Sequence, residues 1–242
     1  MKYKGEGNLK LRGVKMRICK FMTFLFLSIV ICLTLKIKVE GGETKKIILI
    51  DPGHGGIDGG AVSSSNTLEK DLNLEISLKL KDMLTSEGYK VFMTRDKDIS
   101  LSENSNVKQK KREDLNKRCA MKRQVGCDIF LSIHMNKFND SSVSGSQVWY
   151  PINSQESKKL SECLQNSFVK NLNQKGNRQP KGVKDDYVIL RDGYEKASII
   201  VECGFISNKE EEDKLKNSEY QMELCRAMVM GIKDYFSGGS LN

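Results

Sequence analysis

Apolar residues recur along the chain in short continuous runs, which alternate with segments whose apolar residues are spaced three or four positions apart, as on one face of a helix. Runs typical of buried strands cover residues 46–50, 89–93, 128–133, 146–150, 187–190 and 198–201. Helical spacing predicts helices over 71–87, 112–125, 155–173 and 218–236, whereas the polar stretch 100–111 predicts a loop. This alternation predicts an α/β fold, a single domain with a twisted, mostly parallel sheet of about six strands and helices on both faces.

The first 41 residues differ from the rest of the chain. Basic residues precede an uncharged apolar run of 15 residues, Phe21 to Leu35, which is the pattern of an export signal. No A-x-A cleavage site follows and the run is short for a membrane span, so a cleaved signal peptide and a retained membrane anchor both stay open. We therefore expect a targeting segment at 1–41 that contacts the membrane, and an exported catalytic domain at 42–242.

Charge argues against a nucleic-acid partner. The net charge is +9, but nine of the 40 basic residues and only two of the 31 acidic residues lie in residues 1–41. Residues 42–242 therefore carry 31 basic and 29 acidic residues, a net charge of +2. A nearly balanced domain lacks the basic surface that phosphate backbones require.

Cysteine usage predicts no disulfide framework. Seven cysteines are present, and five of them follow the export segment without a C-x-x-C pair: Cys119, Cys127, Cys163, Cys203 and Cys225. Most are expected to be small apolar core residues. Cys203 keeps an alternative role as a nucleophile partnered by a histidine.

Both histidines of the chain follow predicted strands. His54 lies in the glycine-rich stretch ILIDPGHGGIDGG, and His134 comes directly after the strand at 128–133. Because ligands of such folds gather at the carboxyl ends of the strands, the pair predicts a zinc site, although hydrogen-bonded core histidines would look the same. Glu69 is either a third ligand or an acid that favours a helix start. Glu202, at the end of an apolar run, is either a general base or one half of a structural salt bridge.

Several blocks of sequence resemble the zinc-dependent N-acetylmuramoyl-L-alanine amidases, the type 3 amidase family of bacterial cell-wall hydrolases. They are IDPGHGGIDGGA, EKDLNL, TRDKD, DIFLSIHMN and VECGFISN, in family order across residues 46–236. The resemblance implies Zn²⁺ held by His54, Glu69 and His134, Glu202 as the catalytic glutamate, and peptidoglycan with its stem peptide as substrate. Two roles remain open for Asp51, which either orients a ligand histidine or caps the loop. The loop glycines, Gly53 and Gly60 among them, are expected to let the chain turn and a glycan approach the metal.

Within the family, TRDKDISLS and KREDLNKR resemble the germination-specific amidases of endospore formers. This implies a role in the spore cortex, on the path to muramic delta-lactam, and a location in the forespore or cortex space. A vegetative amidase of cell separation and a zinc peptidoglycan deacetylase are the alternatives. Met135 and the pair Lys196 and Ala197 depart from the family pattern and put substrate preference in doubt. The interval between His134 and Glu202 predicts no built-in inhibitory helix, which leaves room for a separate activating or recruiting protein.

Overall fold

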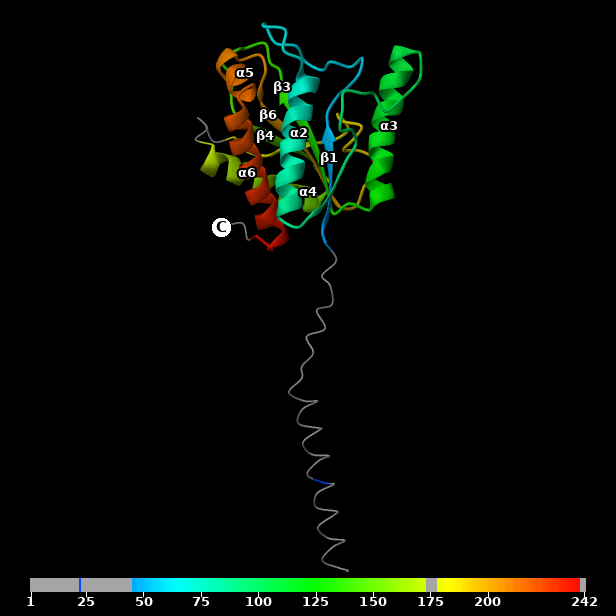
Figure 1. The fold of residues 1–242 in the computed structure, drawn as a ribbon, viewed down its shortest axis with the longest axis vertical. Coiled ribbons are helices and arrows are strands. Elements are labelled where there is room, and N and C mark those ends of the chain that lie inside the picture. Colours follow the sequence, from blue (N-terminus) through cyan, green and yellow to red (C-terminus); the bar gives the residue numbers. More distant parts are fainter. Residues whose placement is uncertain (1–21, 23–44, 173–177, 240–242) are drawn as a thin grey trace, which may run out of the picture. The chain divides into compact units, whose positions relative to one another are not determined.

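A six-stranded sheet forms the centre of the computed structural model, which describes Met22, residues 45–172 and residues 178–239 (Figure 1). The strand order is β2-β1-β3-β6-β4-β5. The strands are β1 (Ile47–Pro52), β2 (Lys90–Met93), β3 (Ile129–Asn136), β4 (Gln147–Pro151), β5 (Lys181–Val183) and β6 (Ala197–Phe205). Apart from Met22, the predicted export segment lies outside the described residues.

Four strands, β2, β1, β3 and β6, run parallel, so their carboxyl ends meet at one edge of the sheet. The prediction of a mostly parallel sheet is therefore confirmed. β4 is antiparallel to β6 and places its first residue, Gln147, beside Glu202. The register also sets His134 of β3 directly opposite Glu202 of β6.

Helices cover both faces of the sheet, because alternate residues of each buried strand point to opposite sides. One core cluster includes Ile48, Leu131 and Val201; it packs under α2 (Glu69–Ser86), α4 (Gln155–Asn171) and α6 (Ser218–Phe236). The other includes Leu49, Phe130 and Ile200 and packs under α3 (Val107–Val125) (Figure 1). A short helix, α5 (Lys209–Leu215), follows β6. Among the described helices, none is long and apolar enough to cross a membrane.

The predicted strand at 187–190 is wrong. This segment forms a turn in which the Leu190 amide donates to the Tyr187 carbonyl, and the sixth strand is β5. The buried ammonium of Lys122 on α3 donates to the Ile189 carbonyl and to Asp192 Oδ1 (2.9 Å). These bonds hold the apolar run against the helix, where its side chains are buried without sheet pairing.

Two helices also differ from the predictions. Each begins in a polar segment without helical apolar spacing, where an asparagine side chain caps the first turn. α3 begins at Val107 and not at 112, since the Asn106 side chain accepts from the Gln109 amide (3.1 Å). α5 was missed altogether. Asn208 caps it by accepting from the Glu211 amide (3.1 Å), a common N-cap arrangement.

The contact between α4 and α6 depends on the absence of a side chain at Gly231. A Cβ atom there would lie 2.8 Å from the Leu164 Cα atom of α4. Gly231→Ala is therefore expected to lower the free energy of unfolding by about 1–3 kcal/mol in urea denaturation, although Ala is the better helix former. Met230→Ala, at a half-exposed position of the same helix, is the control. A Gly231→Ala protein as stable as the original would contradict this packing account.

Candidate active site

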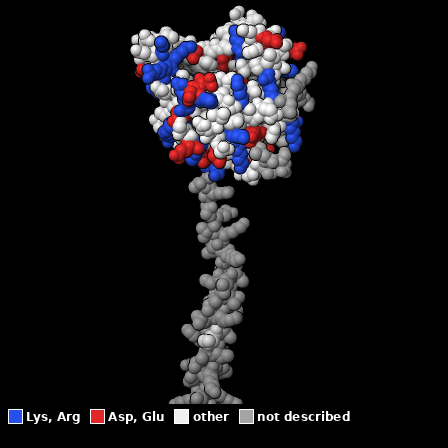
Figure 2. Space-filling view, turned by 180° about the vertical axis from the view of Figure 1, so that it is seen from behind, with Lys and Arg blue, Asp and Glu red and all other residues white. Residues whose placement is uncertain are grey.

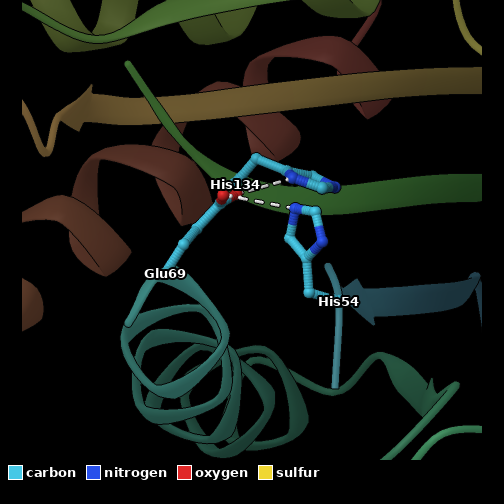
Figure 3. A group of neighbouring side chains, drawn as sticks. All are labelled: His54, Glu69 and His134. Atoms are coloured by element: carbon cyan, nitrogen blue, oxygen red, sulfur yellow. Dashed lines mark hydrogen bonds and ion pairs between the residues drawn. The ribbon is translucent and has the colours of Figure 1, made fainter. Parts of the chain in front are cut away.

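Three side chains from separate segments converge at the carboxyl edge of the sheet. His54 follows β1, Glu69 is the first residue of α2, and His134 lies near the end of β3 (Figure 3). Each offers one ligand atom, and these atoms lie within 4.8 Å of one another. The two imidazole rings stand edge to face, with centroids 4.9 Å apart. The structure thus brings together the three residues that the sequence singled out as zinc ligands.

Glu69 joins the two histidines. Its Oε1 lies 2.8 Å from His134 Nδ1 and its Oε2 lies 3.2 Å from His54 Nε2. The backbone amides of Met135 and Ala61 also donate to this carboxylate, at 3.1 and 2.7 Å. Burial alone would raise the pKa of Glu69, but the hydrogen bonds from His134 and His54 hold it well below its usual range. The carboxylate is therefore ionised and directed at the histidines, and the helix-start role does not account for its position.

His54 is held from its other side by Asp58, a residue that the sequence analysis missed. Asp58 Oδ2 lies 3.0 Å from His54 Nδ1, and Lys111 of α3 pairs with Asp58 Oδ1 at 2.8 Å. Burial lowers the pKa of His54, but hydrogen bonds to Asp58 and Glu69 outweigh it and raise the value to about 9. His54 also has a φ of 62°, which is unusual outside glycine. The signal available in the sequence was an acid four residues after the histidine, in the same loop.

Asp51 supports the loop rather than a histidine ring. Its carboxylate accepts from Thr94 Oγ1 (2.6 Å) and Ser132 Oγ (2.7 Å), and pairs with Arg118 of α3 at 2.6 Å. The same guanidinium donates to the carbonyl oxygens of Pro52 and His54, at 2.8 and 2.7 Å. Of the two roles expected for Asp51, the one in the loop fits these contacts. Arg118 was not identified from the sequence.

The glycines of the loop make room for the ligand side chains. A Cβ atom on Gly53 would lie 2.3 Å from the His134 ring, and one on Gly60 would lie 2.5 Å from Glu69 Oε2. The space beside both glycines is therefore filled by the protein itself. The two glycines thus make room for His134 and Glu69, and the expected approach of a glycan at the loop stays a prediction.

Glu202 reaches the same place from β6, and its side chain is 7% exposed. Among the described residues, its Oε2 has no hydrogen-bond partner and its carboxyl forms no ion pair. Burial raises the pKa of Glu202 to about 7, and the nearby negative charge of Glu69 adds to this rise. These features do not fit the salt-bridge alternative, and they suit a group that accepts and returns a proton near neutral pH.

Cys203, the alternative nucleophile, points away from this site. It is fully buried and belongs to the core cluster under α2, α4 and α6. Burial raises the pKa of its thiol well above the ordinary value, and a thiol in such surroundings is inert. The suggestion that Cys203 attacks a substrate is therefore wrong.

The histidines, Glu69 and Glu202 line a cleft of about 450 Å³. One wall is formed by the first turns of α3, including Lys110 and Lys111, and another by Trp149 and the turn from Asp186 to Ile189. Between His134 and Glu202, the helix among the described residues is α4, which packs against α6 and β4. No described helix of this interval lines the cleft.

Comparison with known proteins identifies the family of this domain. The family model described as N-acetylmuramoyl-L-alanine amidase matches residues 48–234. The germination-specific N-acetylmuramoyl-L-alanine amidase of Bacillus subtilis is 31% identical over 229 residues, which cover 90% of this chain and 95% of that protein. AmiC, an N-acetylmuramoyl-L-alanine amidase of Escherichia coli, is 30% identical over 83% of this chain and 55% of its own length.

Solved structures show the same fold. The CwlD amidase of Clostridioides difficile, solved in complex with the GerS lipoprotein, superimposes with a TM-score of 0.77 at 37% identity. The match covers 80% of this chain and 100% of that one. An N-acetylmuramoyl-L-alanine amidase of Clostridium difficile 630 gives a TM-score of 0.71 at 28% identity, over 81% of this chain and 99% of that one. The chain therefore belongs to the N-acetylmuramoyl-L-alanine amidase family of peptidoglycan-cleaving enzymes.

Proposed function

We propose that this chain is a zinc-dependent hydrolase of the amide bond between the lactyl group of N-acetylmuramic acid and the L-alanine of the stem peptide. The observation that carries the proposal is the convergence of two imidazoles and one carboxylate beside a buried Glu202 whose Oε2 has no hydrogen-bond partner among the described residues. Two histidines and one glutamate are a typical ligand set of catalytic zinc, which keeps a fourth position open. The donor set of His54, Glu69 and His134 therefore fits this metal.

Zinc bound by these residues would supply a water of lowered pKa and a Lewis acid for the lactyl carbonyl. Glu202 then has two tasks. Its carboxylate accepts the proton of the attacking water, and the resulting acid gives that proton to the nitrogen of the departing L-alanine. A carboxyl with a pKa of about 7 exchanges protons in both directions near neutral pH. The histidine–glutamate cluster fixes where the reacting carbonyl lies relative to this carboxyl.

We further propose that the substrate is spore cortex peptidoglycan and that the enzyme acts outside the cytoplasm, with residues 1–41 as signal peptide or anchor. Support comes from the 31% identity to a germination-specific amidase over 95% of that protein's length. Vegetative wall is the alternative substrate. The complex of the similar CwlD amidase with a lipoprotein supports a separate exported protein as activator or recruiting partner.

The proposed reaction predicts defined products. The purified full chain, loaded with zinc, is incubated with cortex and with vegetative peptidoglycan, and the products are analysed by mass spectrometry. We expect free stem peptides with an L-alanine amino terminus, lost on chelation and reduced at least 100-fold by Glu202→Gln, since general acid–base catalysis contributes about 10²–10⁴-fold. Release of acetate instead of peptides would overturn the amidase assignment in favour of a deacetylase.

Asp58 is expected to raise zinc affinity by orienting His54. Asp58→Asn keeps the shape of the side chain but weakens the acceptor for His54 Nδ1, so zinc affinity should fall about 10- to 100-fold, measured by competition with a fluorescent chelator. Asp71→Asn, which removes a charge from an exposed position of α2, is the matched control. Equal affinities in the two variants would contradict a positioning role for Asp58.

The buried Glu202 carboxyl predicts a pH-dependent stability difference in metal-free protein. The pKa of Glu202 is raised from its ordinary 4.5 to about 7, so the folded state binds its proton more tightly than the unfolded chain. Ionising the buried Glu202 carboxyl therefore lowers the free energy of unfolding. This loss is absent below pH 4.5, grows between pH 4.5 and 7, and stays constant above pH 7. Glu202→Gln should gain roughly 3 kcal/mol of stability over the original protein by pH 8 and nothing at pH 4, in urea denaturation with chelator. A difference that does not change with pH would argue against a strained carboxylate.

A further inference from the structure

Most charged groups that line the cleft are already paired within the protein. Arg118 pairs with Asp51 and Asp114. Lys111 and His54 share Asp58. Lys137 donates to the Val62 carbonyl. Apart from Glu202, the charged side chains of the cleft that have neither a hydrogen bond nor an ion pair among the described residues are Lys110 on α3 and Asp186 on the opposite wall.

Lys110 lines the same cleft as the histidine–glutamate cluster, and the next residue of its helix, Lys111, contacts the edge of that cluster. Lys111 contacts Asp58 at 2.8 Å, and Asp58 contacts His54 at 3.0 Å. Lys110 is half-buried in the cleft wall, and its side chain has no hydrogen bond or ion pair among the described residues. An unpaired ammonium in such a position favours an anion.

The sequence of α3 supports a role outside helix stability. Its first turn holds no acid, and four basic residues follow the cap within two turns: Lys108, Lys110, Lys111 and Arg112. Positive charge at this end of a helix opposes the macrodipole. Figure 2 shows Lys and Arg side chains gathered at the upper left, where α3 lies in this reversed view. A local arrangement that costs helix stability is expected at functional sites.

We propose that Lys110 is a specificity-determining residue that pairs with the free α-carboxylate of the second residue of the stem peptide. This inference rests on the proposed function, because that function places the stem peptide in this cleft. The second stem residue is joined through its side-chain carboxyl, so its α-carboxyl is either free or amidated. An extended chain advances about 3.3–3.6 Å per residue, which puts this group roughly 7 Å from the scissile bond. Lys110 lines the same cleft as the histidines and Glu202.

The opposite wall explains which side the carboxylate takes. Asp186 is exposed there, beside Tyr187, whose ring stacks edge to face on Trp149 with centroids 5.2 Å apart. A stem carboxylate on that side would meet a like charge. The negative wall and the positive wall together orient the stem peptide, with its second residue toward α3.

The test uses the full chain loaded with zinc and two muropeptides that differ only in a free or amidated α-carboxyl on the second stem residue. The original enzyme should cleave the free acid with a kcat/KM about five- to tenfold higher, mainly through KM. Lys110→Gln should remove this preference by lowering kcat/KM for the free acid to the level of the amidated muropeptide. Lys110→Glu should invert it. Lys108→Gln removes the same charge from an exposed position of the same helix outside the cleft and should keep the preference.

Three results decide the matter. A preference that disappears in Lys110→Gln and persists in Lys108→Gln supports the pairing. A preference equal in both variants, or no preference in the original enzyme, overturns it while the amidase assignment stands. No cleavage of either muropeptide, by an enzyme that also fails on intact cortex and wall, overturns the proposed function and this inference with it.

Discussion

The Glu69 carboxylate is 3% exposed, yet both of its oxygens are used by residues outside its own helix. Oxygen Oε1 accepts from the β3 side, at His134 and Met135, and Oε2 from the loop side, at His54 and Ala61. A buried ionised carboxylate is stable only when it is paired and hydrogen-bonded. This requirement ties the end of β3, the loop after β1 and the start of α2 into one unit, and the geometry of the cleft depends on it.

The surroundings of that unit are held by buried charges as well. Arg118 and Asp51 fix the backbone of the His54 loop from the α3 side. From the other side, Glu212 of α5 is fully buried and accepts from three hydroxyl groups in the segment that leads into Glu69, those of Ser63, Ser65 and Thr67. Both ends of the segment that carries the ligands are therefore anchored to other helices. The two histidines need not rely on a bound metal for their approximate positions.

The sequence allowed a good prediction of the sheet and of the principal site residues, because these follow from local patterns. Apolar runs predicted five of the six strands. Because the carboxyl ends of parallel strands meet at one edge of the sheet, the sequence also predicted that His54 and His134 lie close together. Glu69 and Glu202 remained undecided between chemical and structural roles until the resemblance was used, since spacing does not show where a carboxylate points. Arg118 and Glu212 were missed because their roles depend on partners distant in sequence. Asp58 was missed although its partner His54 lies only four residues before it, since spacing within a loop does not show which way a side chain points. The error at 187–190 has the same origin, since the buried Lys122 on α3 decides the conformation of that apolar run.

Two glutamates in one cleft thus meet opposite conditions. Glu69 is surrounded by donors, which keep it charged, whereas Glu202 is buried with no hydrogen-bond donor for its Oε2 among the described residues, and its burial and the charge of Glu69 favour its neutral form against the pull of the two histidines. Environments that push the pKa values of two neighbouring carboxyl groups apart suit them to different tasks, which in the proposed function are holding a cation and moving a proton. In metal-free protein, a proton on His54 occupies part of the place of that cation, because Asp58 and Glu69 raise the pKa of the ring to about 9. Asp58 therefore acts in two ways at once. In the proposed function it orients the imidazole for zinc, and together with Glu69 it strengthens the binding of the proton that zinc must displace, so zinc loading would depend on pH through these contacts.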